Sequence, residues 1–168
     1  ATVFRDEINE NMPTTSSLGE KSSDIVGHIE LSPNNFFKSN YSFSLSNNLD
    51  VLKYSSLDAE IIVNNFITSF KYLEENDNIG DENYIQNNTS FNFNENSSFG
   101  FSIRKNKKID LTEFYDLIYQ YKNDCLTAAI KYRKDFYVDD DLKPTEQLFF
   151  SLTIVPLGAY ETANIIPK

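Results

Sequence analysis

The sequence is poor in several residue types on which compact soluble domains depend. It has one Cys, no Trp, 5 Gly and 5 Pro among 168 residues. A single Cys excludes an internal disulfide framework, and the shortage of Gly and Pro leaves Asn, Asp and Ser to form the turns. No apolar run approaches the ~18 residues of a membrane-spanning helix, so any crossing of a membrane has to be made by strands.

Basic residues are also in short supply. There are 15 Lys and Arg against 25 Asp and Glu, which gives a formal net charge of -10 and an isoelectric point near 4.5. This balance argues against a nucleic-acid partner, because phosphate binding needs a basic surface. The length is that of one domain. The chain begins with Ala and shows no signal peptide, so we expect a fragment or a processed chain.

The sequence is rich in aromatic residues and in segments where apolar and polar residues alternate. Aromatics make up 14% of the chain, with Tyr 10 and Phe 14. Three alternating segments follow one another within residues 111–158. In the middle segment Leu126, Ala128, Ile130 and Tyr132 fall on one side of an extended chain, and the residues between them fall on the other. A period of two predicts antiparallel strands, because a helix would mix the two sets.

The same period recurs upstream. Further alternating segments cover residues 25–32, 37–46, 54–63, 66–72, 84–94 and 98–104, the fifth of them interrupted by Asn87 on its apolar side. The sequence therefore predicts an all-β chain of about nine strands in antiparallel up-and-down order, most near the ~9–11 residues that cross a bilayer at a tilt. Residues 23–157 would hold these strands, after a polar loop or disordered end at 1–22 and before a tail at 158–168.

The breaks between the predicted strands alternate in length. Those near 33–35, 64–65, 95–97 and 122–124 are short, and those at 47–53, 74–82 and 139–145 are longer, with 105–108 as the exception. Short turns on one side and long loops on the other are typical of a transmembrane β-barrel, here a segment of a larger one. The region 1–22 would then lie on the extracellular side. A soluble sheet with one wet face produces the same alternation of residues, but it gives no reason for sorted loops.

The charged residues of the strands fit a water-filled barrel. A charge facing lipid near the bilayer centre costs roughly 2–4 kcal/mol. The five strand charges at issue all fall on the polar side: Asp58, Glu60, Lys71, Lys131 and Arg133. The apolar side would face lipid, with Tyr near the segment ends as interface girdles.

Three patches carry a resemblance to a known family. They are residues 21–33, KSSDIVGHIELSP, residues 121–127, YKNDCLT, and residues 139–150, DDDLKPTEQLFF. In order and spacing they resemble the C-terminal barrel strands of the LptD family of lipopolysaccharide-assembly outer-membrane proteins. The resemblance covers residues 22–158 and implies a part in transporting lipopolysaccharide to, and inserting it into, the outer leaflet of the outer membrane. The implied partners are lipopolysaccharide, an outer-membrane lipoprotein plug of the LptE type and a periplasmic bridge protein.

The resemblance implies two kinds of site. Cys125 is similar to a family cysteine that forms a disulfide with a periplasmic N-terminal domain, so its partner would lie outside this sequence. This chain has Asp124 where some members have a second, adjacent cysteine, which leaves one such bond at most. The last long strand would close against the first barrel strand at the lateral gate through which lipid leaves; its residues are Gln147, Leu148, Phe149, Phe150, Ser151, Leu152, Thr153, Ile154 and Val155.

Other candidates for chemistry are weak. His28 has no partner in the sequence for a general-base or metal role and reads as a lumen-facing polar residue. Asp139, Asp140 and Asp141 lack the spacing of a calcium loop. No nucleophile pairs with a base, so we expect no enzyme, no cofactor and no metal. Two other classes stay open: a generic porin-like barrel, and a secreted β-sandwich whose exposed rings stack on sugars.

Overall fold

The computed structural model describes residues 2–4, 11, 21–76, 80–136, 143–155 and 158–161. These residues form an all-β chain of ten antiparallel strands in a single sheet. The strands are β1 (Ile25–Asn34), β2 (Phe37–Leu45), β3 (Leu52–Val63), β4 (Phe66–Glu75), β5 (Asn83–Asn92), β6 (Ser97–Asn106), β7 (Leu111–Lys122), β8 (Leu126–Asp135), β9 (Thr145–Ile154) and β10 (Gly158–Glu161).

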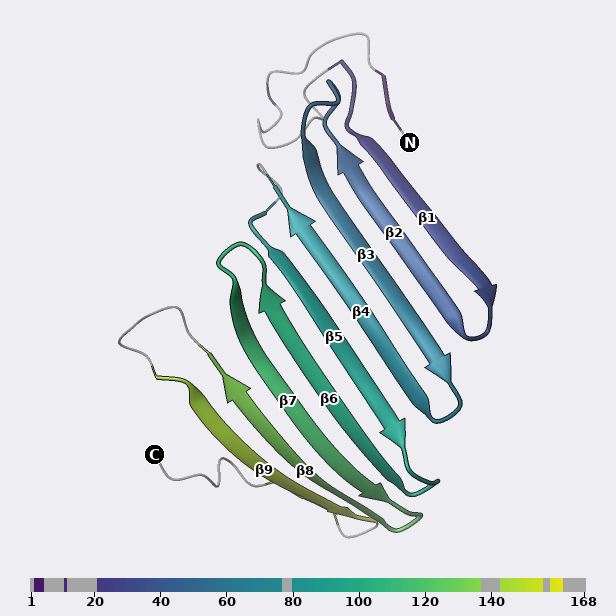
Figure 1. Ribbon diagram of the computed structural model, residues 1–168, viewed down its shortest axis with the longest axis vertical. Coiled ribbons are helices and arrows are strands. Elements are labelled where there is room, and N and C mark those ends of the chain that lie inside the picture. Colours follow the sequence, from purple (N-terminus) through teal and green to yellow (C-terminus); the bar gives the residue numbers. More distant parts are fainter. Residues whose placement is uncertain are drawn as a thin grey trace.

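The strands pair strictly in chain order, from β1 to β10, as the alternation predicts (Figure 1). The nine predicted strands are confirmed, including β5, the segment that Asn87 interrupts, which pairs with β6. The tenth is an addition, because β10 falls in residues assigned to the tail. A segment of four residues is too short for an alternating pattern to predict a strand. β10 is defined instead by its pairing with Ser151–Ile154 of β9.

The connections are sorted between the two ends of the sheet. The turns after β1, β3, β5 and β7 have two to four residues, and the loops after β2, β4, β6 and β8 have four to nine. Figure 1 shows the first group, the short-turn end, at the lower right and the second group, the long-loop end, at the upper left. The predicted sorting of the connections is therefore confirmed. The loop 107–110 is the shortest of the loops at the long-loop end.

Asparagine replaces glycine as the turn residue. The side-chain oxygens of Asn34, Asn94, Asn106 and Asn123 each accept backbone N–H groups from residues two or three positions ahead. Asn64 adopts φ 51°, a left-handed value that Asn tolerates better than most residues and that suits a two-residue hairpin turn. This is how the chain makes tight hairpins with so little Gly and Pro.

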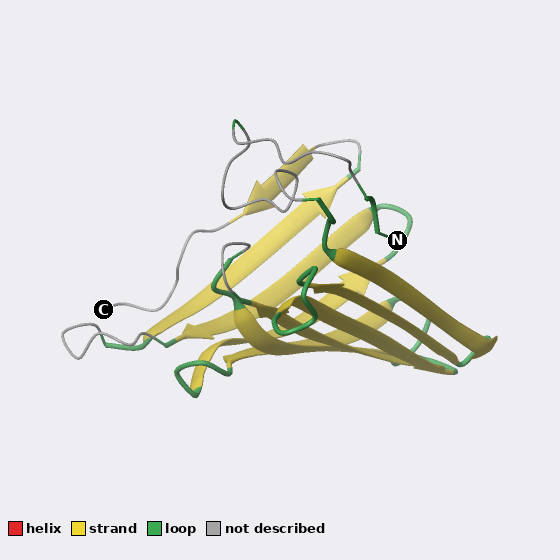
Figure 2. Ribbon diagram, turned by 90° about the horizontal axis from the view of Figure 1, so that it is seen from above, coloured by secondary structure: helices red, strands yellow, loops and turns green. Residues whose placement is uncertain are grey.

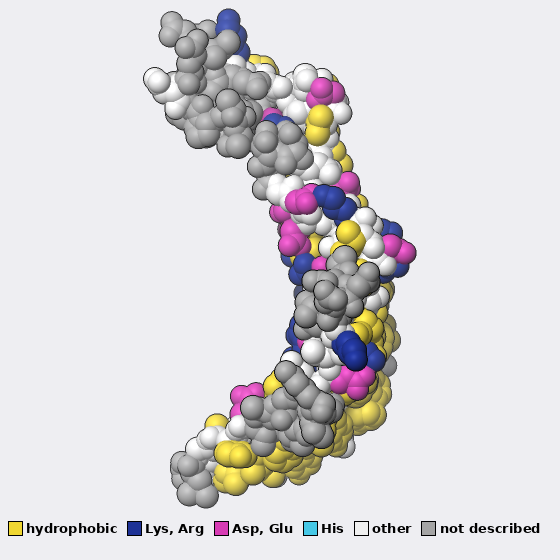
Figure 3. All heavy atoms as spheres, turned by 90° about the vertical axis from the view of Figure 1, so that its left-hand side faces the viewer, with side chains coloured by type: hydrophobic (Ala, Val, Ile, Leu, Met, Phe, Trp, Pro, Cys, Tyr) yellow, Lys and Arg dark blue, Asp and Glu magenta, His cyan; other side chains and the backbone are white. Residues whose placement is uncertain are grey.

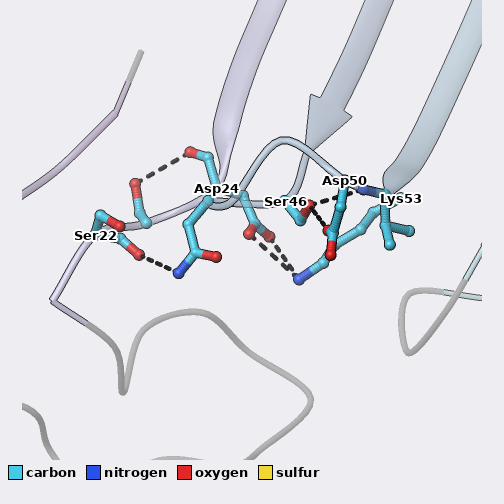
Figure 4. A network of polar contacts seen from close by, with 8 residues as sticks. Ser22, Asp24, Ser46, Asp50 and Lys53 are labelled. Atoms are coloured by element: carbon cyan, nitrogen blue, oxygen red, sulfur yellow. Dashed lines mark hydrogen bonds and ion pairs between the residues drawn. The ribbon is translucent and has the colours of Figure 1, made fainter.

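A polar network ties the first strands together at the long-loop end (Figure 4). The Lys53 ammonium on β3 lies 3.2 Å from both carboxylate oxygens of Asp24, which precedes β1. Both side chains are more than four-fifths buried. In the loop between β2 and β3, Ser46 donates to Asp50 at 2.8 Å and accepts from the backbone of Val51 at 3.0 Å. The network links β1 to β3 across β2.

The sheet is an open, curved layer, and the described residues form no core on either side of it. Figure 2 shows one layer of strands with loops at its ends, and Figure 3 shows that layer as a crescent. Tyr84 is the only buried hydrophobic residue among those that the structure describes. The chain therefore has the arrangement of a barrel segment, with strand edges at β1 and at β9 and β10 that are not joined to each other.

Candidate functional site

The register places apolar side chains together on one face of the sheet, here called the apolar face. One row across it consists of Ile29, Tyr41, Leu57, Tyr72 and Ile85. A second row consists of Phe66, Phe91, Phe99, Tyr119, Ile130 and Phe150. These side chains are not buried by the protein: Ile85 is 44% exposed and Ile130 is 47% exposed. In Figure 3 the hydrophobic atoms cover the convex side, most clearly in the lower half of the view.

The opposite, polar face is concave and carries rows of hydrophilic residues (Figure 3). The row at mid-height, the central polar row, is continuous from β2 to β9: Lys38, Glu60, Ser69, Asn88, Ser102, Asp116, Arg133 and Gln147. The neighbouring row consists of Glu30, Asn40, Asp58, Lys71, Gln86 and Arg104. All five charges that the sequence assigned to the polar side, Asp58, Glu60, Lys71, Lys131 and Arg133, lie on this face.

Most charges on the polar face are compensated by a neighbour. The carboxylate of Asp116 lies 3.3 Å from the Lys131 ammonium and 3.5 Å from the Arg133 guanidinium. Arg104 reaches Glu82 at 2.8 Å and Glu113 at 2.5 Å, which joins the loop after β4 to strands β6 and β7. The face is thus highly polar without a strong excess of one sign along most of its width.

The apolar face ends in charges at the long-loop end. Lys134 donates to Glu146 at 2.7 Å, with the ring of Phe136 beneath the ammonium. Lys105, near the end of β6, lies 2.7 Å from Asp110 in the loop that follows. The hydrogen bond from Lys105 together with its charge holds the pKa of Asp110 below its usual range. At the short-turn end Tyr119 and Tyr121 border the same face. The apolar face is thus a band with ion pairs along its long-loop end and tyrosine rings along its short-turn end.

One polar cluster interrupts the apolar face. Thr68 and Thr89 join their hydroxyls at 2.8 Å, and Asn87 donates to Thr68 at 2.9 Å while accepting from Thr89 at 3.0 Å. A further bond from Asn87 goes to the Ser69 carbonyl at 3.1 Å. Thr68 is only 7% exposed. The cluster satisfies its own hydrogen bonds, which explains how an Asn is accommodated where the sequence pattern requires an apolar residue.

Cys125 lies in the turn between β7 and β8, at the short-turn end where the sequence placed it. The thiol is free and exposed. The turn itself is well held: the Cys125 N–H donates to Asn123 at 3.0 Å, and the Cys125 carbonyl accepts from the Val155 N–H at 2.9 Å. The structure thus presents the thiol on a fixed hairpin.

Of the nine residues in the predicted gate strand, Gln147 to Ile154 form most of β9, and Val155 begins the next turn. One edge of β9 pairs with β8 along its whole length. The other edge pairs with β10 only at Ser151–Ile154, so the half nearer the long-loop end has no strand beside it among the described residues. Sequence reasoning missed this partial covering, because it missed β10.

His28 lies on the polar face, as predicted, with its Nδ1 2.9 Å from the Ser42 hydroxyl. Asp139, Asp140 and Asp141 lie outside the described residues. Within the described ranges no three His, Cys, Asp or Glu side chains are grouped as a metal site would require. Nor does that part of the chain contain a helix long and apolar enough to cross a membrane.

Comparison with known proteins gives no match: no protein-family model, no curated protein and no solved structure resembles the chain significantly.

Proposed function

We propose that this chain is a strand segment of an outer-membrane β-barrel. The observation that carries the proposal is the exposed, curved apolar face. A row such as Phe66, Phe91 and Phe99 left in water would forfeit about 25 cal/mol for each Å² of apolar surface, whereas lipid covers it at no such cost. The sorted turns and the concave polar face support the same conclusion.

Within this class, we propose a part in lipopolysaccharide transport to the outer leaflet and in its insertion there. The support is the family resemblance, and the three patches that carry it fall at β1, at the β7–β8 turn and at β9. An amphipathic glycolipid needs a polar path for its sugars and an exit into lipid for its acyl chains. The concave polar face offers the first, and the edge of β9, which is only partly paired among the described residues, offers a candidate for the second. A lipoprotein plug and a periplasmic bridge protein are the partners that the resemblance implies.

Depletion of the full-length protein tests this function directly. Outer membranes should contain the protein, and its depletion should lower the amount of lipopolysaccharide at the cell surface. Gel mobility with and without reductant, compared between wild type and Cys125→Ser, should show a shift that the variant abolishes. Recovery of the protein in the soluble fraction, or unchanged surface lipopolysaccharide after depletion, would contradict the proposal.

A porin-like barrel is the second candidate, and one observation favours it. The central polar row is continuous across β2 to β9, which is the lining expected of a water-filled channel. Conductance in planar bilayers separates the two functions: steady, large single-channel currents favour diffusion of small solutes, and their absence in a protein needed for surface lipopolysaccharide favours transport. The sandwich alternative is less favoured, because no second sheet covers the apolar face among the described residues.

A further inference from the structure

A hollow of about 290 Å³ lies on the polar face over β2 to β5, at mid-height of the sheet. Its polar lining comes from the two neighbouring polar rows, with Lys38, Asn40, Asp58, Glu60, Lys71 and Asn88 as the side chains able to hold a ligand. Two cationic, two anionic and two amide groups are thus gathered in one concave place, from four successive strands.

The groups in this hollow are left incompletely partnered, in contrast to the rest of the face. Of the strand lysines in the described residues, only Lys71 and Lys122 form no ion pair, and Lys122 ends its strand. Lys71 stands opposite Asp58 in the register without reaching it. Lys38 is 4.0 Å from Glu60, the longest ion-pair distance among the described residues. These charges are available to a ligand.

The amide of Asn88 is oriented by its neighbours. Its oxygen accepts hydrogen bonds from Ser102 at 2.6 Å and from Gln86 at 3.2 Å. With the oxygen occupied twice, the amide nitrogen is left to donate. Lys71 and Asn88 therefore supply donors, and Asp58 and Glu60 supply acceptors, within one hollow.

This mixture selects a ligand class. Ammonium and amide donors bind a phosphate or carboxylate, with charge-assisted bonds as the stronger contribution. The carboxylates at the same place would repel a bare anion, and the lysines would repel a metal ion, but the carboxylates accept hydrogen bonds from hydroxyl groups. A ligand with both an anionic group and several hydroxyls satisfies all of them.

The surroundings leave room for a longer ligand. Ser90 and Gly100 continue the polar face from the mid-height hollow toward the short-turn end. There a second hollow, of about 440 Å³, is lined mainly by amides, among them Asn92, Asn94 and Gln120. Between the two hollows the Ile118 side chain lies over Gly100, 2.6 Å from the place that a Cβ would take, so an apolar group borders the polar face there. A ligand long enough to reach the second hollow would meet hydrogen-bonding amides again there.

We propose that the mid-height hollow binds an acidic saccharide, one that carries a phosphate or carboxylate among its hydroxyls. The proposal deepens the proposed function and rests on it in one respect: the concave face has to be the solvated interior of the barrel. The saccharide could be the head of a glycolipid or a free oligosaccharide, and both present the same chemistry to Lys71 and Asp58.

The test is an isothermal calorimetric titration of the full-length protein in detergent micelles with three saccharide probes. The probes are lipopolysaccharide, the phosphorylated core oligosaccharide freed of its lipid, and a neutral glucose oligomer of similar size. Lys71→Gln should weaken binding of the two phosphorylated probes by about tenfold, and Asp58→Asn by about fivefold. The matched control is Lys131→Gln, a lysine on the same face but outside the hollow, which should change affinity less than about twofold.

Each outcome decides. If the free phosphorylated oligosaccharide binds and Lys71→Gln weakens that binding, the site is supported, and its ligand can be a free or a lipid-linked saccharide. If Lys71→Gln weakens the binding of lipopolysaccharide alone, the site is supported and its ligand is the glycolipid. Equal binding of the neutral oligomer, or equal effects of Lys71→Gln and Lys131→Gln, would overturn it. Depletion of the protein separates the two proposals. If only the saccharide site is wrong, depletion still lowers surface lipopolysaccharide; if the proposed function is wrong, depletion leaves surface lipopolysaccharide unchanged.

Discussion

The two faces of the sheet differ in almost every respect although they are built from alternate residues of the same strands. On β8, Ile130 is 47% exposed on the apolar face, and its neighbour Lys131 pairs with Asp116 on the polar face. On the apolar face rings such as Phe91 stay exposed, whereas most charges described on the polar face are paired with a charge of opposite sign. We infer from this difference that the two faces meet different media, and the predictions below compare residues of one face with residues of the other or of the long-loop end.

The largest effect should come from a charge placed in the middle of the apolar face. Ile130→Arg should destabilise the folded protein by about 2–4 kcal/mol, because the guanidinium would face lipid near the bilayer centre. Ala129→Arg, one residue away on the polar face, should cost less than about 1 kcal/mol. Urea-induced unfolding in lipid vesicles measures both. Equal costs for the two variants would show that the faces are not solvated differently.

The polar cluster on the apolar face gives the next effect. Asn87→Ala removes the donor to Thr68 and the acceptor for Thr89, and leaves their hydroxyls under-satisfied away from water, at a cost of about 1–2 kcal/mol. Asn88→Ala on the polar face should cost about 0.5 kcal/mol or less, because water replaces the lost bonds. The same unfolding assay compares them, and a larger loss for Asn88→Ala would reverse the assignment of the faces.

Most of the fold could be predicted from the sequence, because a period of two is a local signal. The strands around Ile130 and Phe150 follow from it directly. What depends on register could not be predicted: Thr68 and Ser69, which accept hydrogen bonds from Asn87, come from β4, and the hollow around Lys71 and Asp58 requires four strands to be aligned. The chain also shifts register between Ser44 and Leu45 and between Arg104 and Lys105, which no local pattern announces.

The loss of a single ion pair should have a weaker effect than the changes above, in proportion to the burial of the pair. Lys53→Met leaves the Asp24 carboxylate without its ammonium in a place that is mostly buried, and should cost about 1 kcal/mol. Lys38→Met removes a long, exposed ion pair and should cost roughly 0–0.5 kcal/mol. Comparison of their unfolding midpoints tests the ranking, which the opposite order would refute.

The smallest effect is a pH response in the loop after β6. Because Lys105 lowers the pKa of Asp110, their pairing stabilises the loop above the ordinary carboxyl range and is lost as pH falls through the lowered pKa. In Lys105→Gln the pKa of Asp110 should rise toward its ordinary value, as followed by carboxyl NMR chemical shifts. An unchanged Asp110 titration in this variant would mean that the ion pair at 2.7 Å does not persist in solution.

The most direct test of the account is a scan of solvent exposure along one strand. In a Cys125→Ser background, single cysteines placed at each of residues 126–133 would carry a spin label in lipid vesicles. The account predicts high oxygen and low nickel-complex accessibility at Leu126, Ala128, Ile130 and Tyr132, and the reverse at Thr127, Ala129, Lys131 and Arg133. Equal accessibility to the aqueous nickel complex on both sets would contradict a lipid-covered apolar face.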